Sequence, residues 1–198
     1  MAAPARRLAT LDDLLEAERE GVACEIVDGE LVQKAMSDHE HGGVKFVISG
    51  YLADPFNRRG GGGRPGGWWL ANEVDIAFDA ENVLRPDVAG WRRDRVAVMP
   101  REWPTTVTPD WVCEVLSAST ARRDLGTKRD TYHRARVGHY WVVDRNSRVL
   151  LVYRWTEVGY ALVLTGGETD TVHAEPFGAV GIYVGRLFGL DEPDEAPG

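Results

Sequence analysis

This sequence of 198 residues has no long apolar segment, only two cysteines and no excess of positive charge. No run of about 18 apolar residues occurs, so the sequence predicts no membrane-spanning helix. The first residues lack the apolar core of a secretory signal, and we therefore expect a cytoplasmic protein. The two cysteines, Cys24 and Cys113, lie in apolar alternation. That context is typical of buried free thiols and argues against a disulfide framework or a zinc site.

The formal net charge is -8, from 23 Lys and Arg against 31 Asp and Glu. Non-specific binding to nucleic acids grows with the number of phosphates neutralised, so this balance argues against a general coat protein. The charge is uneven along the chain, however. Six basic residues against two aspartates give a local charge of +4 over 119–137. Four acidic residues and two prolines fall in 191–198, which we predict to be a flexible tail after one domain over 1–190.

The hydrophobic pattern predicts helices and strands mixed along the chain. Thr10 is suited to cap a helix over 10–20, and the pair Asp28-Gly29 predicts a hairpin between strands 23–27 and 30–34. Ser37 and Glu40 have the spacing of a capping box for a helix to about residue 52. A third helix, capped by Ser119 or Thr120, should run to about 136. The remaining expected elements are strands at 69–72, 74–78, 86–91, 110–117, 139–144, 149–155 and 160–164, and a short element at 181–188. This order predicts an α/β domain with a mixed sheet and helices packed on it.

The segment 57–67, NRRGGGGRPGG, is rich in glycine. A phosphate-binding loop would end in Gly-Lys-Ser/Thr and lead into a helix, whereas two tryptophans and a strand follow here. A flexible surface loop is therefore the favoured interpretation. Its arginines, Arg58 and Arg59 among them, could still contact a phosphate backbone.

Two carboxylates stand out from their surroundings. Glu114 lies inside the apolar run WVCEVL, where a charge is costly unless it is paired or bound to a cation. Asp87 follows Pro86 at the start of a strand, a position where aspartate also serves simply to open a strand or turn. On neighbouring strands the two could approach closely, and a proton or a metal would then have to relieve their repulsion. Hard oxygen ligands suit Mg²⁺ or Mn²⁺, and a salt bridge is the alternative use of Glu114.

Lys128 is a candidate third member of such a site. It lies fourteen residues after Glu114 on the third predicted helix, and Asp124 precedes it by four residues on the same helix face. The simple interpretation is a surface ion pair. The functional one is a cation that reaches the metal site, where it would position the attacking water or neutralise charge in the transition state.

Five stretches of this sequence resemble one family in order and approximate spacing. They are EIVDGELV from Glu25, RPDV from Arg85, EVLSAST from Glu114, RDLGTKRDTY from Arg123 and VGHYWVVD from Val137. Together they resemble the Uma-two family of restriction-endonuclease-like proteins, a branch of the PD-(D/E)XK nuclease superfamily. The resemblance covers about residues 10–155.

This resemblance implies a restriction-endonuclease-like core, with a central mixed sheet flanked by helices and a divalent-metal site at its edge. Asp87 matches the aspartate of the Pro-Asp motif, and Glu114 matches the acidic member of (D/E)XK. The lysine of that motif would stand at Leu116, which departs from the superfamily pattern, and Lys128 on the following helix takes its place. Glu30 matches an acidic residue of the first hairpin and is expected to complete the site, while Glu25 is assigned with less support.

The resulting hypothesis is a Mg²⁺- or Mn²⁺-dependent endonuclease that cleaves DNA and acts as a homodimer. Asp87 and Glu114 would hold the metal, with Lys128 and Glu30 as further catalytic residues. The arginines expected to bind phosphates are Arg122, Arg123, Arg129, Arg58 and Arg59. Two alternatives stay open: a catalytically silent binding or assembly module, and a metal-dependent hydrolase of RNA or nucleotides. His39 and His41 are expected to have helix-surface roles or to contact phosphate.

Overall fold

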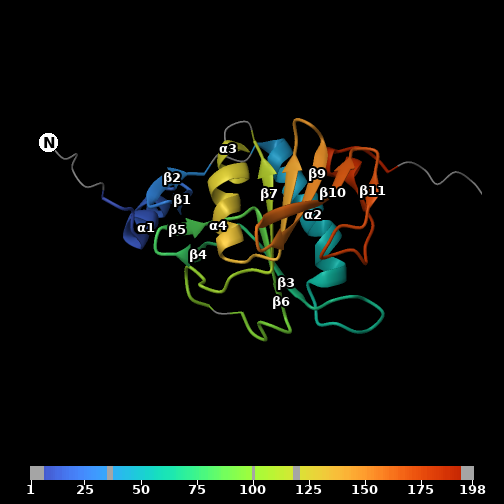
Figure 1. The fold of residues 1–198 in the computed structure, drawn as a ribbon, viewed down its shortest axis with the longest axis horizontal. Helices are drawn as coiled ribbons and strands as arrows, with labels where there is room; N and C mark the ends of the chain where they lie inside the picture. The colour runs from blue at the N-terminus through green and yellow to red at the C-terminus, as the bar shows by residue number, and fades with distance from the viewer. Residues whose placement is uncertain (1–6, 35–37, 100, 118–120, 193–198) are drawn as a thin grey trace, which may run out of the picture.

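A six-stranded mixed sheet forms the centre of the molecule in the computed structural model, which describes residues 7–34, 38–99, 101–117 and 121–192. Its strand order is β10-β9-β8-β7-β6-β3 (Figure 1). The pair β7–β8 is parallel and the other neighbours are antiparallel. The strands are β3 (Trp68–Asn72), β6 (Val88–Arg92), β7 (Trp111–Leu116), β8 (His139–Asp144), β9 (Val149–Thr156) and β10 (Gly159–Gly167).

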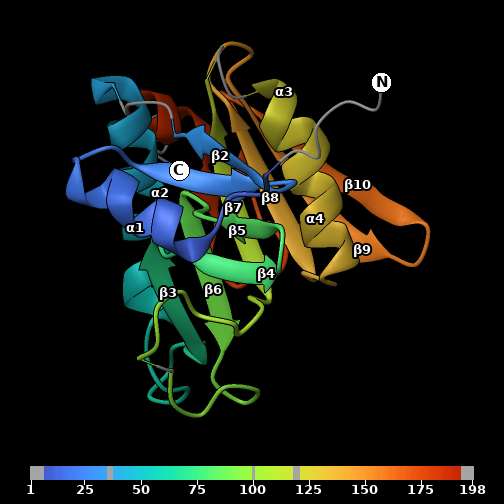
Figure 2. The same ribbon diagram turned by 90° about the vertical axis from the view of Figure 1, so that its left-hand side faces the viewer.

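A second, four-stranded antiparallel sheet lies across one side of the first, together with helix α1 (Figure 2). Its order is β2-β1-β5-β4, and we call it the small sheet. It consists of β1 (Cys24–Val27), β2 (Glu30–Gln33), β4 (Ile76–Asp79) and β5 (Asn82–Leu84), and α1 spans Leu11–Arg19. A two-stranded ribbon, β11 (Thr171–Val172) and β12 (Ile182–Tyr183), precedes the 3-10 helix η2 (Val184–Phe188).

The two faces of the large sheet have different covers. Helix α2 (His39–Phe56) and η2 pack on one face, against a cluster that contains Trp111, Cys113 and Val115 of β7. The small sheet and α4 (Arg129–Arg134) pack on the other face, against Val112 and Leu116. Because side chains alternate along a strand, Glu114 points to the same side as Val112 and Leu116. The central acid of β7 therefore faces the small sheet and α4.

The expected elements are largely present, with informative differences at their ends. Helix α2 continues beyond residue 52 to Phe56, because Phe56 is itself buried in the core. It begins after Asp38, whose side chain accepts a hydrogen bond from the His41 amide, while Ser37 lies outside the described residues. The three-residue strand β5 was not expected from the sequence, since so short a run carries no clear alternation.

The third predicted helix is not uniform. It consists of α3 (Ala121–Arg123), a π-helical turn η1 (Asp124–Lys128) and α4. The proposed caps Ser119 and Thr120 lie outside the described residues, as do residues 193–198 of the predicted tail. Within the described ranges, no helix combines the length and the apolar character needed to cross a membrane.

Thr10→Ala is expected to lower the free energy of unfolding by about 1 kcal/mol. Thr10 and Asp13 form a capping box, in which the Asp13 amide donates to the threonine hydroxyl and the Asp13 carboxylate accepts from the Thr10 amide. Urea unfolding of the variant measures the loss. Thr10→Ser keeps the hydroxyl and should stay near wild type; an equal loss in both variants would contradict the capping role.

Candidate active site between the two sheets

Asp87 and Glu114 come together at the boundary between the large and small sheets. Asp87 stands one residue before β6, and its Oδ2 accepts a 2.8 Å hydrogen bond from the amide of Val115 on β7. That bond ties the Asp87 carboxylate to the residue that follows Glu114. Both carboxylates are only 2% exposed. Buried charges of this kind require cations or protons nearby.

Lys128 supplies a cation to this region from η1. Its Nζ lies 2.7 Å from Glu114 Oε1, 2.9 Å from Glu25 Oε1 and 3.6 Å from Asp124 Oδ1. The expected sharing of a helix face by Asp124 and Lys128 is thus confirmed. The lysine is only 2% exposed, so one ammonium group faces three carboxylates away from solvent. π-Helical turns occur frequently at functional sites, and this one holds two members of the cluster.

Glu25 is the acidic residue of the first hairpin that enters the cluster. It pairs with Val32 across β1 and β2 and points toward the large sheet, like Val27 two residues on. Its Oε1 also accepts a 2.7 Å hydrogen bond from the amide of Arg85, and Arg123 Nη1 lies 3.9 Å from its Oε2. The Glu25 side chain is thereby fixed by contacts with η1, with α3 and with the connection between β5 and β6.

Lys34 and His41 occupy the other side of Asp87. Lys34 Nζ lies 3.0 Å from Asp87 Oδ1 and donates a 2.7 Å hydrogen bond to the carbonyl of Arg85. His41 Nε2, from the first turn of α2, lies 3.3 Å from the same Asp87 oxygen. Neither contact has the geometry of a hydrogen bond. Asp87 Oδ1 and His41 Nε2 are both buried without a hydrogen-bond partner.

The ionisable groups of the cluster perturb one another strongly. Burial raises the pKa of Glu114 from 4.5 to about 8, and repulsion from Asp124 and Asp87 adds to this shift despite the nearby Lys128. Burial opposes ionisation of Glu25 and Asp87 as well, but the pKa of each is lowered. Lys128 and Lys34 outweigh burial at Glu25, and His41 and Lys34 do so at Asp87. One carboxyl group of the cluster therefore lacks sufficient positive charge, which a proton or a divalent cation would supply.

Two buried tyrosines hold the cluster in place. Tyr132 of α4 donates a 2.5 Å hydrogen bond to Glu114 Oε1, and Tyr140 of β8 donates a 3.0 Å bond to the carbonyl of Asp124. Both rings are fully buried and pack against each other with centroids 5.5 Å apart. Burial, together with the Glu114 charge, raises the pKa of the Tyr132 hydroxyl well above its ordinary value. Tyr132 therefore serves as a neutral donor to Glu114.

The structure does not bring every predicted site residue into this cluster. Glu30 is exposed at the start of β2, opposite Val27. It does not line the small cavity that the cluster around Glu114 encloses. The register explains the difference, because Glu30 lies two positions closer to the hairpin turn than Val32, the partner of Glu25. The hairpin acid of the cluster is thus Glu25.

The predicted phosphate-binding arginines fall into two groups. Arg123 lines the cavity, Arg122 is exposed and Arg129 partly exposed on the same helical segment. Arg58 and Arg59 are exposed beyond the opposite end of α2. The helix rises about 22 Å over the fifteen steps from His41 to Phe56, at 1.5 Å per step, so that loop is remote from the cluster.

Two residues of the cluster were missed by sequence reasoning, although signals for them exist. The expected surface role of His41 is wrong, because its side chain is buried. It precedes Val44, Ile48 and Leu52 at helical spacing, which places it on the buried face of α2. The signal for Lys34 is the rarity of lysine: the sequence has only three lysines against twenty arginines. Those lysines are Lys34, Lys45 and Lys128, and Lys45 forms a 2.8 Å ion pair with Glu73, which also lies 3.8 Å from Lys34.

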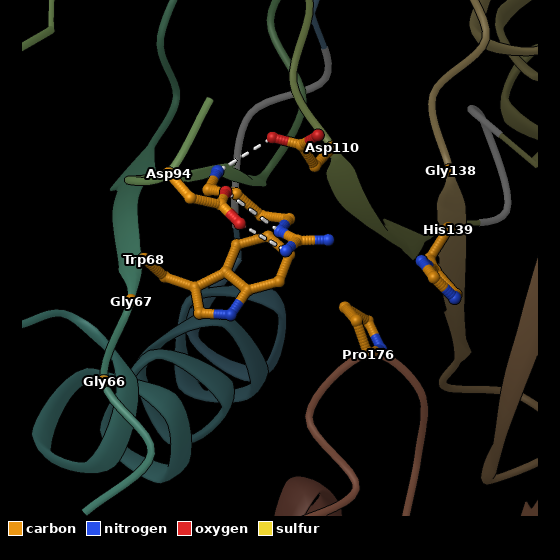
Figure 3. A pocket seen from close by; sticks show the side chains of 9 residues that line it. Gly66, Gly67, Trp68, Asp94, Asp110, Gly138, His139 and Pro176 are labelled. Atoms are coloured by element: carbon orange, nitrogen blue, oxygen red, sulfur yellow. Dashed lines mark hydrogen bonds and ion pairs between the residues drawn. The ribbon is translucent and has the colours of Figure 1, made fainter. Parts of the chain in front are cut away.

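A larger hollow of about 440 Å³ lies at the opposite end of the strands. Trp68, His139 and Pro176 lie around it (Figure 3). Its charged groups are engaged with one another: Arg92 pairs with Asp94, and the Asp110 carboxylate accepts from Arg95 and from the Arg92 amide. The cluster around Glu114 instead surrounds a cavity of about 20 Å³, room for about one water molecule. The small cavity, with its unsatisfied carboxylate, is therefore the better candidate for chemistry.

Comparisons with known proteins agree with this architecture. The model of the Uma2 family, described as "Putative restriction endonuclease", matches residues 9–184. A crystal structure from Anabaena variabilis, described as a "putative nuclease belonging to DUF820", superposes with a TM-score of 0.66. That match has 19% sequence identity and covers 91% of this chain and 98% of the other. It shows that the two proteins share a fold. No curated protein matches the sequence. Since the family match spans most of its length, this chain belongs to the Uma2 family.

Proposed function

We propose that this chain is a divalent-metal-dependent endonuclease that hydrolyses phosphodiester bonds in DNA. One observation carries the proposal: Asp87, Glu114 and Lys128, from three separate segments, meet in one buried cluster with a small central cavity. The description of the Uma2 family supports the same class of reaction. A glutamate in the middle of a central strand is costly, and a catalytic role explains why it is there.

Asp87 and Glu114 are the residues proposed to hold Mg²⁺ or Mn²⁺. Among the described residues, no three His, Cys, Asp or Glu side chains are close enough together to enclose a metal ion. Mg²⁺, however, commonly binds through one or two carboxylates and keeps water and substrate phosphate as its other ligands. The buried, unsatisfied Asp87 Oδ1 and the raised pKa of Glu114 fit such a site. When bound, the ion would polarise the phosphoryl group and lower the pKa of a bound water.

Lys128 is proposed to act as a donor rather than as a base. Burial alone would lower the pKa of its ammonium, but the surrounding carboxylates raise it well above 10.5. The group therefore stays protonated over the pH range in which proteins are stable. A fixed ammonium 2.7 Å from Glu114 can orient the attacking water or neutralise the charge that develops on the phosphate.

The positive side chains around the cluster are proposed to hold the DNA backbone. Arg123 and Lys34 line the cavity, while Arg122 and Arg129 lie on the same helical segment. Arg58 and Arg59 would contact phosphates about 22 Å further along the duplex, the length of α2 from His41. A homodimer is part of the proposal, because two copies related by a twofold axis can each cut one strand.

Wild-type protein is expected to convert supercoiled plasmid DNA to linear product in the presence of Mg²⁺ or Mn²⁺. Addition of a chelator should stop cleavage, and excess Mn²⁺ should restore it, because the proposed carboxylates need a cation to act. Agarose gel electrophoresis separates nicked from linear plasmid, and direct linearisation is the outcome expected of a dimer. RNA of matching sequence serves as the substrate control.

The same assay separates the alternatives. Cleavage of RNA without cleavage of DNA would favour a ribonuclease. A folded protein that cuts neither substrate with any divalent ion would contradict the proposal and favour a silent binding module.

A further inference from the structure

His41 is buried beside Asp87, and packing alone does not account for this position. It is only 8% exposed, and its Nε2 atom points toward the Asp87 carboxylate from the first turn of α2. Nevertheless, neither His41 Nε2 nor Asp87 Oδ1 has a hydrogen bond. Buried polar atoms are almost always satisfied, because an unpaired one costs about 1–3 kcal/mol. Lys34 supplies charge to Asp87 Oδ1 but does not complete its hydrogen bonding. Two atoms that lie side by side at the edge of a cavity without a hydrogen bond point to a shared missing partner.

The separation of the two atoms indicates what that partner is. His41 Nε2 and Asp87 Oδ1 lie 3.3 Å apart. Two ligands bonded to one metal at about 2.0–2.1 Å are about 2.8–3.4 Å apart at angles between 90° and the tetrahedral value. A carboxylate oxygen and an unprotonated imidazole nitrogen are both common metal ligands. We propose that His41 is a metal ligand beside Asp87, an inference that rests on the metal-dependent function proposed above.

Lys34 explains how Asp87 can be stable when no metal is bound. Its ammonium lies 3.0 Å from Asp87 Oδ1 and supplies positive charge to the oxygen that would bind the metal. The same ammonium donates to the Arg85 carbonyl and lies 3.8 Å from Glu73. Lys34 can therefore withdraw from Asp87 and still keep polar partners on its other side.

An imidazole ligand has a consequence for metal choice. Sites made only of carboxylate, carbonyl and water suit Mg²⁺, whereas nitrogen ligands favour transition metals. With His41 in the coordination shell, the site should bind Mn²⁺ more tightly than Mg²⁺. Replacing the histidine by a side chain without a ring nitrogen should weaken Mn²⁺ binding far more than Mg²⁺ binding.

The test measures Mn²⁺ binding to the full chain by isothermal titration calorimetry and by pulsed electron paramagnetic resonance. Wild type should show modulation from a directly bound imidazole nitrogen, and His41→Ala should lose it together with at least about tenfold in Mn²⁺ affinity. His39→Ala, an exposed histidine of the same helix turn, is the matched control and should behave as wild type. Circular dichroism on each variant verifies folding.

A second variant distinguishes a ligand from a residue that only positions Asp87. His41→Gln keeps an amide donor of similar reach, so it would preserve affinity if the histidine merely oriented the carboxylate. The proposal expects the nitrogen modulation to vanish in His41→Gln and the affinity to fall. Mn²⁺ bound by wild type without a nitrogen signal, or bound equally by His41→Ala, would overturn the ligand role of His41.

Failure of the proposed function gives a different result. If wild type binds Mn²⁺ through a histidine nitrogen but cuts no nucleic acid, the metal site stands and the nuclease assignment falls. If wild type cuts DNA with Mg²⁺ while His41→Ala keeps full Mn²⁺ affinity, the nuclease stands and His41 is not a ligand. If wild type binds no Mn²⁺, both the metal site and the role of His41 are overturned.

Discussion

Glu114→Gln should reduce DNA cleavage by at least about 100-fold and weaken Mn²⁺ binding by at least about tenfold, since even the outer-shell partners of metal ligands contribute 10–100-fold. The amide has nearly the same shape and can still accept the hydrogen bond from Tyr132, so the fold is expected to persist. Plasmid cleavage rates and calorimetric Mn²⁺ titration measure the two effects. Glu157→Gln, at an exposed turn, is the matched control.

The same variant should change how stability depends on pH. Burial raises the pKa of Glu114 from 4.5 to about 8 in the folded state, so folding is favoured when this group is protonated. Its contribution to stability is fully present below about pH 4.5 and is lost as the pH rises through about 8. Relative to Glu114→Gln, wild type should therefore lose stability between these values. Urea unfolding at pH 5 and pH 8 measures the difference, and an unchanged difference would refute the assignment.

Lys128→Met is expected to lower the free energy of unfolding by about 3–5 kcal/mol at pH 7, the cost of removing one partner from a buried ion pair. Methionine matches the length of the lysine stem but leaves Glu25, Glu114 and Asp124 without their common cation. The carboxyl groups then favour protonation, so the pKa values in the folded variant rise. The loss should consequently shrink as the pH is lowered toward the range where the unfolded carboxylates also bind protons.

Lys45→Met provides the comparison for that experiment. The Lys45 ammonium pairs with Glu73, whose side chain is 45% exposed, so this ion pair is partly solvated and its loss should cost less than the loss of Lys128. Cleavage by the Lys128 variant should fall by about 10²–10³-fold, the usual cost of removing one fixed donor that stabilises charge in the transition state. Equal stability loss in both variants, or wild-type cleavage by Lys128→Met, would contradict the assigned role.

Local patterns in the sequence were sufficient to predict much of the framework. The Asp28-Gly29 turn adopts positive φ at both residues, as a tight two-residue hairpin requires, and it joins β1 to β2. The apolar run around Glu114 became a strand buried on both faces. Such features depend on the backbone preferences and burial of neighbouring residues, so they can be inferred without knowledge of distant contacts. The mixed α/β class, with its central mixed sheet, followed from the order of these elements.

The composition of the candidate site could be predicted only in part. Asp87, Glu114 and Lys128 were identified because a charge in an apolar strand and a family-like spacing are visible along the chain. The choice between Glu25 and Glu30, which lie on the same face of the hairpin, depended on the strand register and on which end of that face meets the large sheet. Helical phase alone could have placed His41 on a buried face, but not beside Asp87, which is 46 residues away in the sequence.

By itself, the sequence determined most of the secondary structure, the mixed α/β class, and the two acids and one lysine that are anomalous for their positions. The tertiary structure decided which other charges surround them: Glu25, Lys34 and His41 enter the cluster, whereas Glu30 and the glycine-rich loop lie elsewhere. The physical reason is range. Helix caps, tight turns and the alternation of apolar residues depend on near neighbours in the chain, whereas the electrostatics of a buried site depend on distances of 3–4 Å between residues from separate elements.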